Sequence, residues 1–245
     1  MAPYGRELTP PEQIRSNRRA GVLWWLVFIG HFALGFAAKR ATPRISLAVL
    51  FGAAQLADLM WPVFVATGLE RVRIDPGNTA FTPLDFVSYP YSHSLALLVA
   101  WGFAFALIYR AASGRNGWTV LVLTLLVVSH WMLDWLTHRP DMPLYPGGPK
   151  VGIGLWNSVA GTLVVELAIF ALGVWIYARA TRALDGVGRW AFAGLVTALI
   201  AIYSLNLAAG PPPSVSAIWI AGLLGGGLLL AWAAWIDRHR AVVTQ

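Results

Sequence analysis

Residues 118–138 read WTVLVLTLLVVSHWMLDWLTH, an apolar stretch that carries three ionisable side chains in its second half. About 20 mostly apolar residues in a row make a helix long enough to cross a bilayer. A helix keeps its backbone hydrogen bonds internal, as the hydrocarbon core requires. We therefore predict a membrane-spanning helix over Trp118–His138.

The whole chain has the composition of an integral membrane protein. Of its 245 residues, 58% are apolar and only 12% are charged, whereas soluble domains carry about 25% charged residues. So little charge cannot cover a water-soluble surface, and it also excludes a disordered chain or a coiled coil. The chain has no Cys, so any metal would be held by imidazole and carboxylate ligands.

Six further stretches have the length and apolar character of a span, and we expect an all-α, polytopic membrane protein with about seven transmembrane helices in one bundle. The absence of an internal repeat predicts a single transmembrane domain over residues 21–238, between an amino-terminal tail, 1–20, and a carboxy-terminal tail, 239–245. The predicted spans are Gly21–Ala38, Ile45–Ala66, His93–Ala111, Trp118–His138, Val151–Tyr177, Arg189–Ala209 and Val215–Ile236.

Two connections between the predicted spans, Glu70–Ser92 and Arg139–Lys150, are long, and alternation places both on one face of the bundle. The other connections are short and basic: Lys39–Arg44, Arg110–Gly117 and Ala178–Gly188. Short basic loops are typical of the cytoplasmic side, although the amino-terminal tail, which alternation puts with the long loops, also carries Arg residues. We favour long loops that face away from the cytoplasm and form a lid.

The first long loop carries two local signals. Asp75-Pro76-Gly77-Asn78 is typical of a turn. Thr82-Pro83-Leu84-Asp85 has the pattern of a capped helix start, so we expect a short helix there.

The net charge of +7 predicts lipid partners rather than nucleic acid, because Lys and Arg are scattered singly between apolar runs. Basic residues at the ends of spans interact with lipid headgroups and set the topology. We therefore expect membrane lipids as partners and no nucleic acid.

His130, Asp134 and His138 follow one another at four-residue steps, which places them on one face of a helix. Adjacent turns bring Cβ atoms to about 5–6 Å, so two of these side chains can share one cation, as two His do at this spacing in zinc proteases. The alternative is a His–Asp hydrogen bond that stabilises helix packing.

His93 and Asp58 stand at two further places where a metal ligand is plausible. Ser92 would cap a helix that starts at His93, and the helix dipole there disfavours a protonated imidazole, which leaves the neutral form that binds metals. Pro62 deprives the Asp58 carbonyl of its usual helical partner. The structural alternatives are an interfacial His93 and an Asp58 that caps a kinked helix.

His31 and Glu166 lie in the middle of predicted spans, where ionisable groups usually mark function. A lone His31 would more often be a core residue, and a shared polar site is the expected source of its partner. Glu166 could orient a ligand imidazole, act as a general base, or be a neutral acid bonded to another helix.

Taken in order, these motifs resemble a family of bacterial membrane-bound, metal-dependent hydrolases. The likeness covers roughly residues 30–146 and not the last three spans. Members of that family are linked to the zinc-dependent phospholipase C and nuclease group, whose metal sites use His and Asp. The motifs that carry the likeness are Gly30-His31, Asp58 ahead of Pro62, Ser92-His93-Ser94, and Ser129-His130 with Asp134 and then Pro143-Leu144.

The resemblance implies a divalent metal ion as cofactor, Zn first and Mn or Fe as alternatives. Where the family has further ligands, this chain has Leu59-Met60-Trp61 and Ser88-Tyr89-Pro90. The smaller set implies one metal, or two if His138 is recruited. The implied metal ligands are His31, Asp58, His93, His130 and Asp134.

Together with the resemblance, these residues predict metal-dependent hydrolysis of a phosphoester or lipid-linked substrate. The resemblance also implies the cytoplasmic membrane of a bacterium. We assign catalytic roles to His138, Arg139 and Glu166. Arg139 would hold an anionic group, because guanidinium matches phosphate; its alternative is a contact with lipid headgroups. The alternative functions are transport of a metal ion or proton through the same residues and a non-catalytic accessory role in the membrane.

Overall fold

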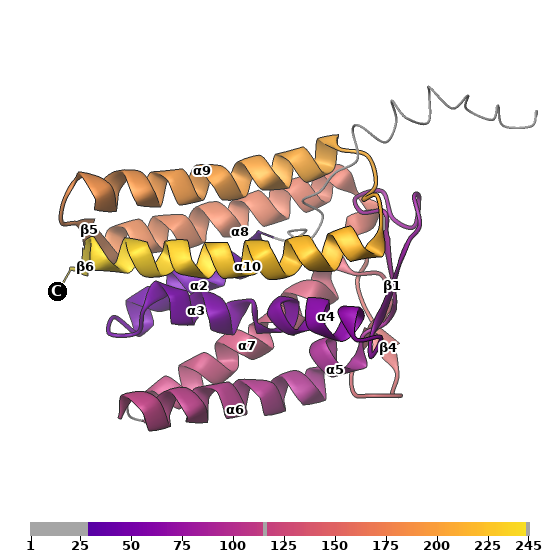
Figure 1. Ribbon diagram of the computed structural model, residues 1–245, viewed down its shortest axis with the longest axis horizontal. Coiled ribbons are helices and arrows are strands. Elements are labelled where there is room, and N and C mark those ends of the chain that lie inside the picture. Colours follow the sequence, from indigo (N-terminus) through magenta and orange to yellow (C-terminus); the bar gives the residue numbers. More distant parts are fainter. Residues whose placement is uncertain (1–28, 115–116, 244–245) are drawn as a thin grey trace, which may run out of the picture.

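The computed structural model describes residues 29–114 and 117–243 of the chain. Its long helices lie side by side, with their axes close to the long direction of the molecule (Figure 1). In chain order the elements are α2 (Gly30–Ala41), α3 (Leu47–Ala54), α4 (Leu56–Ala66), β1 (Arg71–Ile74), β2 (Leu84–Ser88), α5 (Pro90–His93), α6 (Leu95–Ser113), α7 (Gly117–Thr137), β3 (Met142–Pro143), β4 (Lys150–Val151), the 3₁₀ turn η1 (Leu155–Asn157), α8 (Val159–Ala180), β5 (Thr181–Ala183), α9 (Gly186–Ala208), α10 (Val215–Arg238) and β6 (Arg240–Val242).

The two ends of the bundle differ in their strands, and we name them by these. The β1 end carries the β1–β2 and β3–β4 pairs, and the β5 end carries the β5–β6 pair (Figure 1). Both long loops of the sequence lie at the β1 end, as alternation predicts. Residues 240–242, which we expected in a carboxy-terminal tail, form β6 against β5.

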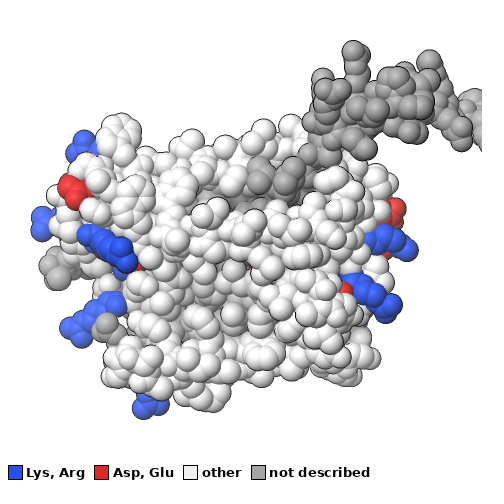
Figure 2. All heavy atoms as spheres, in the orientation of Figure 1, with Lys and Arg blue, Asp and Glu red and all other residues white. Residues whose placement is uncertain are grey.

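The bundle has the surface of a membrane protein. Within the described residues, the five helices α6 to α10 are long and apolar enough to cross a membrane, or six spans if α3 and α4 count as one bent span. In the face shown in Figure 2, Lys, Arg, Asp and Glu gather at the two ends and leave a broad uncharged band between them. The mostly helical fold, with several helices that could cross a membrane, is therefore confirmed. The number seven remains a prediction, because residues 21–28 of the first predicted span lie outside the described residues.

The second predicted span, Ile45–Ala66, is broken. The axes of α3 and α4 differ by 57°, and the break falls at Gln55 rather than at Pro62, which lies inside α4. Next to the break, the carbonyl of Ala54 contacts His130 of α7.

The predicted start of the fifth span is wrong. The fifth span does not start at Val151 but eight residues later, because Lys150–Val151 pairs with β3 and Gly154 takes a left-handed conformation (φ 81°) before η1. Helix α8 starts only after Ser158, whose hydroxyl accepts a hydrogen bond from the backbone N–H of Gly161.

The third predicted span is also shifted. α6 begins at Leu95 with Ser94 at its N-cap, so Ser92 does not cap it, and His93 ends the separate short helix α5. Pro90 is the first residue of α5, a position that suits its fixed φ and missing N–H.

The first long loop forms a hairpin rather than a helix at Thr82–Asp85. Asp85 lies in β2, opposite Arg73 of β1, and the two side chains form an ion pair of 2.6 Å. The predicted turn is confirmed, because the backbone N–H of Asn78 donates to the Asp75 carbonyl. With three two-stranded sheets, the chain is mostly helical and not purely α.

The close packing of α2 on α8 predicts the effect of one substitution. A Cβ added at Gly173 would overlap the backbone of Ala33, and backbone cannot move aside as a flexible side chain can. We expect Gly173→Ala to lower the free energy of unfolding by about 1–3 kcal/mol, measured by chemical unfolding in detergent. Gly227→Ala is the matched control, because a Cβ there meets no described atom within 4 Å; equal stability of the two variants would contradict the packing.

Candidate metal centre

The structure brings the five predicted metal ligands together from four helices. His31 is the second residue of α2, Asp58 lies in the first turn of α4, and His93 ends α5. His130 and Asp134 lie one turn apart in α7. Two groups of three, each with ligand atoms within 4.8 Å of one another, have the donors that a metal ion needs: His31, Asp58 and His130 form one, and His93, His130 and Asp134 form the other.

The carboxylate of Asp134 lies at the middle of this cluster. Its Oδ1 is 3.1 Å from Nε2 of His31, and its Oδ2 is 3.2 Å from Nε2 of His130 and 3.7 Å from Nε2 of His93. Oδ1 of Asp58 completes the cluster at 3.5 Å from His93 Nε2 and 3.7 Å from His130 Nε2. The imidazoles of His31 and His130 stack with their centroids 3.7 Å apart.

His31 Nε2 and Asp134 Oδ1, 3.1 Å apart, form a hydrogen bond, but three of the five separations are longer than a hydrogen bond and suit ligands around a metal. Nitrogen–oxygen hydrogen bonds span about 2.7–3.2 Å, so the contacts of 3.5–3.7 Å are too long. Ligand atoms at about 2.0–2.1 Å from a tetrahedral zinc lie about 3.3 Å from one another. The observed values, 3.1–3.7 Å, bracket that spacing.

His130 is held in the form that can bind a cation through Nε2. Its Nδ1 donates a hydrogen bond of 2.9 Å to the carbonyl of Ala54, the last residue of α3 before the break. Nε2 therefore carries the lone pair of the neutral ring, and it makes no hydrogen bond to any described residue although it is fully buried. Nε2 faces two carboxylates, so its surroundings favour positive charge there, either a proton on Nε2 or a bound cation.

His93 is oriented in the same way by a chain of hydrogen bonds. The Ser92 hydroxyl donates to Oε2 of Glu70 at 2.6 Å, so Nδ1 of His93 donates to the Ser92 oxygen, also at 2.6 Å. Oε1 of Glu70 accepts from the backbone N–H groups of Tyr91 and Ser92 at 2.8 Å. Carboxylates that orient ligand imidazoles are a common feature of metal sites.

Sequence reasoning missed Glu70 as a functional residue, although it recognised Glu70 and Ser92 as the two ends of one long loop. The available sequence signal was a single acidic residue shortly after a predicted span. In the structure, Glu70 is 1% exposed. Its partner is 22 residues away, so the contact depends on the hairpin that closes the loop.

The charges of the cluster point to a divalent cation. With neutral imidazoles, Asp58 and Asp134 bring two negative charges to one place among apolar helices. Buried charges are stable only when they are paired, and a divalent ion balances two carboxylates. The residues therefore fit a metal such as zinc, and manganese or iron would take the same ligands.

His138 lies outside both groups of three. Its Nδ1 donates to Oδ1 of Asp141 at 3.0 Å, and the Tyr89 hydroxyl donates to the same oxygen at 2.7 Å. Burial, together with the Asp141 carboxylate, holds the pKa of Tyr89 well above its ordinary value. Burial alone would raise the pKa of Asp141, but the hydrogen bonds from His138, Tyr89 and Arg139 hold it below its usual range. The ring of Tyr89 also lies 5.2 Å from that of His93, which links this group to the cluster.

Arg139 is paired with protein carboxylates. Its Nε donates to Asp141 Oδ2 at 3.2 Å, and Nη2 donates to Oδ1 of Asp85. Asp85 also binds Arg73, so the end of α7 is tied to the β1–β2 hairpin. The lid itself stays a prediction.

Glu166 of α8 is fully buried and is not part of either candidate metal group. The Tyr203 hydroxyl of α9, the Trp156 indole and the backbone of Ile29 are the polar groups around its carboxyl. Neither carboxyl oxygen of Glu166 makes a hydrogen bond to any described residue, so its three predicted roles stay predictions.

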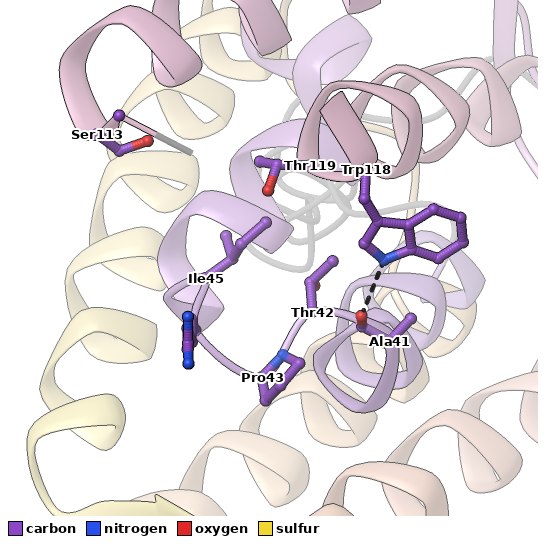
Figure 3. A pocket seen from close by; sticks show the side chains of 9 residues that line it. Ala41, Thr42, Pro43, Ile45, Ser113, Trp118 and Thr119 are labelled. Atoms are coloured by element: carbon purple, nitrogen blue, oxygen red, sulfur yellow. Dashed lines mark hydrogen bonds between the residues drawn. The ribbon is translucent and has the colours of Figure 1, made fainter. Parts of the chain in front are cut away.

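A cavity of about 370 Å³ lies at the β5 end between the α2–α3 connection and the start of α7. Figure 3 shows Pro43, Ile45 and Thr119 at its wall and Trp118, whose indole N–H donates to the Ala41 carbonyl at 3.2 Å. None of the candidate metal ligands lines it, so we place the functional site at the β1 end.

The hydrogen-bond chain through Ser92 gives a matched pair of variants. Ser92 and Ser94 are both fully buried beside His93, but only the Ser92 hydroxyl contacts the imidazole, and Ser94 Oγ has no partner among the described residues. We expect Ser92→Ala to weaken Zn²⁺ affinity by about 10–100-fold in competition with a chelator, and Ser94→Ala to leave it unchanged. Equal affinities in the two variants would refute the orienting role.

Comparisons of the chain with protein-family models, with curated proteins and with solved structures found no match. The likeness to bacterial membrane-bound hydrolases therefore rests on the four motifs of the sequence alone.

Proposed function

We propose that this chain is an integral membrane, metal-dependent hydrolase that cleaves a phosphoester of a lipid-linked substrate. The cation, zinc first and manganese or iron as alternatives, would be held by His31, Asp58, His93, His130 and Asp134. One observation carries the proposal: Nε2 of His130 is buried, without a hydrogen bond in the described part of the chain, and it faces two carboxylates.

A bound divalent cation would supply Lewis-acid polarisation of a phosphoryl or carbonyl oxygen and make a water molecule more acidic. Groups of the chain itself would orient the ligand imidazoles and transfer a proton. Glu70 and Ala54 fix the ring orientations of His93 and His130. His138, whose Nδ1–H donates to Asp141, has its basic nitrogen at Nε2 and can accept or return a proton there.

Arg139 takes a different part in this proposal from the one the sequence predicted. Its guanidinium is paired with Asp85 and Asp141, so it holds the β1–β2 hairpin in place. Arg139 therefore acts as a positioning residue at the β1 end and does not bind the phosphoester in this proposal.

The proposal is tested by metal content and turnover together. The wild-type chain, purified in detergent, should contain close to one or two metal ions by elemental analysis and hydrolyse a chromogenic phosphoester. His130→Ala and Asp134→Ala should lose both. His239→Ala is the control, because His239 lies at the β5 end and binds Asp185.

Two results would contradict the enzyme proposal. Full metal content in His130→Ala would show that the metal binds elsewhere. Metal-ion or proton flux across proteoliposomes, without hydrolysis, would favour transport through the same residues.

We also propose that the protein lies in the cytoplasmic membrane of a bacterium, with the β1 end facing away from the cytoplasm. Positive charge in short loops marks the cytoplasmic side. Described Lys and Arg residues at the β1 end are matched by acidic ones, whereas the β5 end has a large excess of positive charge. The basic residues there are Lys39, Arg40, Arg44, Arg110, Arg179, Arg182, Arg189, Arg238 and Arg240, against Asp185 and Asp237.

The absence of Cys makes this topology directly testable, because any introduced Cys is the only thiol. Lys150 of β4 and Arg182 of β5 are both exposed, at opposite ends. In bacterial spheroplasts, a membrane-impermeant maleimide should label Lys150→Cys, and should label Arg182→Cys only after lysis. The reverse pattern would place the cluster on the cytoplasmic side.

A further inference from the structure

The five candidate ligands differ sharply in their exposure. The side chains of His31, His93, His130 and Asp134 are at most 5% exposed, whereas that of Asp58 is 36% exposed. Any molecule that reaches the cluster in this conformation must therefore approach past Asp58.

Asp58 lines a narrow crevice on the side of the bundle. Gln55 and Leu59, from the same broken span, and Gly222 and Gly226 of α10 also line it. Its volume of about 20 Å³ has room for about one water molecule. Most of its lining is apolar leucine and phenylalanine side chain, which can move aside for an entering chain.

The crevice lies at membrane depth. α10 starts at Val215 at the β1 end, and at 1.5 Å per residue Gly222 and Gly226 lie about 10 and 16 Å along it. The hydrocarbon core of a bilayer is about 30 Å thick. The crevice therefore opens sideways to lipid rather than to water at the β1 end.

Gln55 gives the apolar crevice a polar group that lacks a partner. The residue is 5% exposed, and its Oε1 makes no hydrogen bond to any described residue. A buried amide oxygen without a partner is costly. A ligand that enters the crevice with a polar group can satisfy it beside Asp58.

We propose that the crevice between α4 and α10 is a lateral portal through which a membrane lipid that bears a phosphoester reaches the cluster. The lipid chain lies between α4 and α10, and its polar end meets Gln55 and Asp58. This inference rests on the proposed hydrolase function and names its substrate class. Hydrolysis would break one P–O bond, with the hydroxyl of a water joining phosphorus and the remaining proton passing to the leaving oxygen.

Two adjacent glycines of α10 allow a matched test. A Cβ added at Gly226 would lie 2.7 Å from Leu59 Cδ2 and so narrow the crevice, whereas one at Gly227 meets no described atom within 4 Å. Gly226→Leu fills the crevice. Gly226→Ala is a milder variant, because the end of the Leu59 side chain can shift. Gly227→Leu and Gly227→Ala are the controls.

The experiment measures photo-crosslinks between lipid and protein, and it does not depend on substrate turnover. The full chain is reconstituted in phosphatidylcholine vesicles that contain phosphatidic acid with a photoreactive diazirine in its acyl chain, and the crosslinked residues are mapped by mass spectrometry. We expect crosslinks concentrated on the crevice residues of α4 and α10. Both Gly226 variants should reduce them, Gly226→Leu by about tenfold, while the Gly227 variants keep them.

Metal content and thermal unfolding of the same samples separate the possible failures. Unchanged metal and stability in Gly226→Ala, with fewer crosslinks, would support the portal. Crosslinks spread evenly over α6 to α10, or equally strong in the Gly226 and Gly227 variants, would overturn it. A wild-type chain without metal would instead refute the proposed function, while the crosslink pattern would still decide the portal.

Discussion

Two carboxylates and three imidazoles share one small space inside an apolar helical bundle, and their acceptor atoms face one another. Asp134 and Asp58 approach three Nε2 atoms at 3.1–3.7 Å. At membrane depth such groups are costly unless their charge is balanced. Two neighbouring groups at the β1 end hold the surrounding elements in place. Glu70 orients His93 through Ser92, and Arg139 connects the end of α7 to the β1–β2 hairpin.

The break between α3 and α4 places several residues of the site close together. The bend at Gln55 places the Ala54 carbonyl where His130 Nδ1 can donate to it, and it turns Asp58 towards the imidazoles. The same bend leaves Gln55 beside α10. A straight helix would satisfy its own carbonyls and could not supply a ligand, an acceptor and a lining residue within one turn. Non-helical backbone at this depth is tolerated where it faces a protein cavity.

Apolar length predicted the helical fold, because it is a local signal, whereas the full set of five residues that meet in the cluster was expected only through the resemblance to a hydrolase family. His130 and Asp134 needed only the period of a helix. Glu70 could not be found in this way, because its contact with Ser92 depends on a hairpin whose strands pair across the loop. The start of α8 and the strand at Leu84 were misjudged for a related reason: pairing with β3 and with Arg73 overrides the local pattern. The pairing of Arg139 with Asp85 could not be read from the sequence, because Asp85 is 54 residues away, whereas its second partner, Asp141, is only two residues away.

The central claim is that a cation is held by imidazole and carboxylate alone, and X-ray absorption at the metal edge of the purified chain tests it most directly. The account predicts a first shell of nitrogen and oxygen at about 2.0–2.2 Å, with outer-shell scattering from imidazole and no sulfur shell, since the chain has no Cys. A chain purified from zinc-supplemented cells that shows no metal edge above background would contradict it, and so would a shell of oxygen without imidazole.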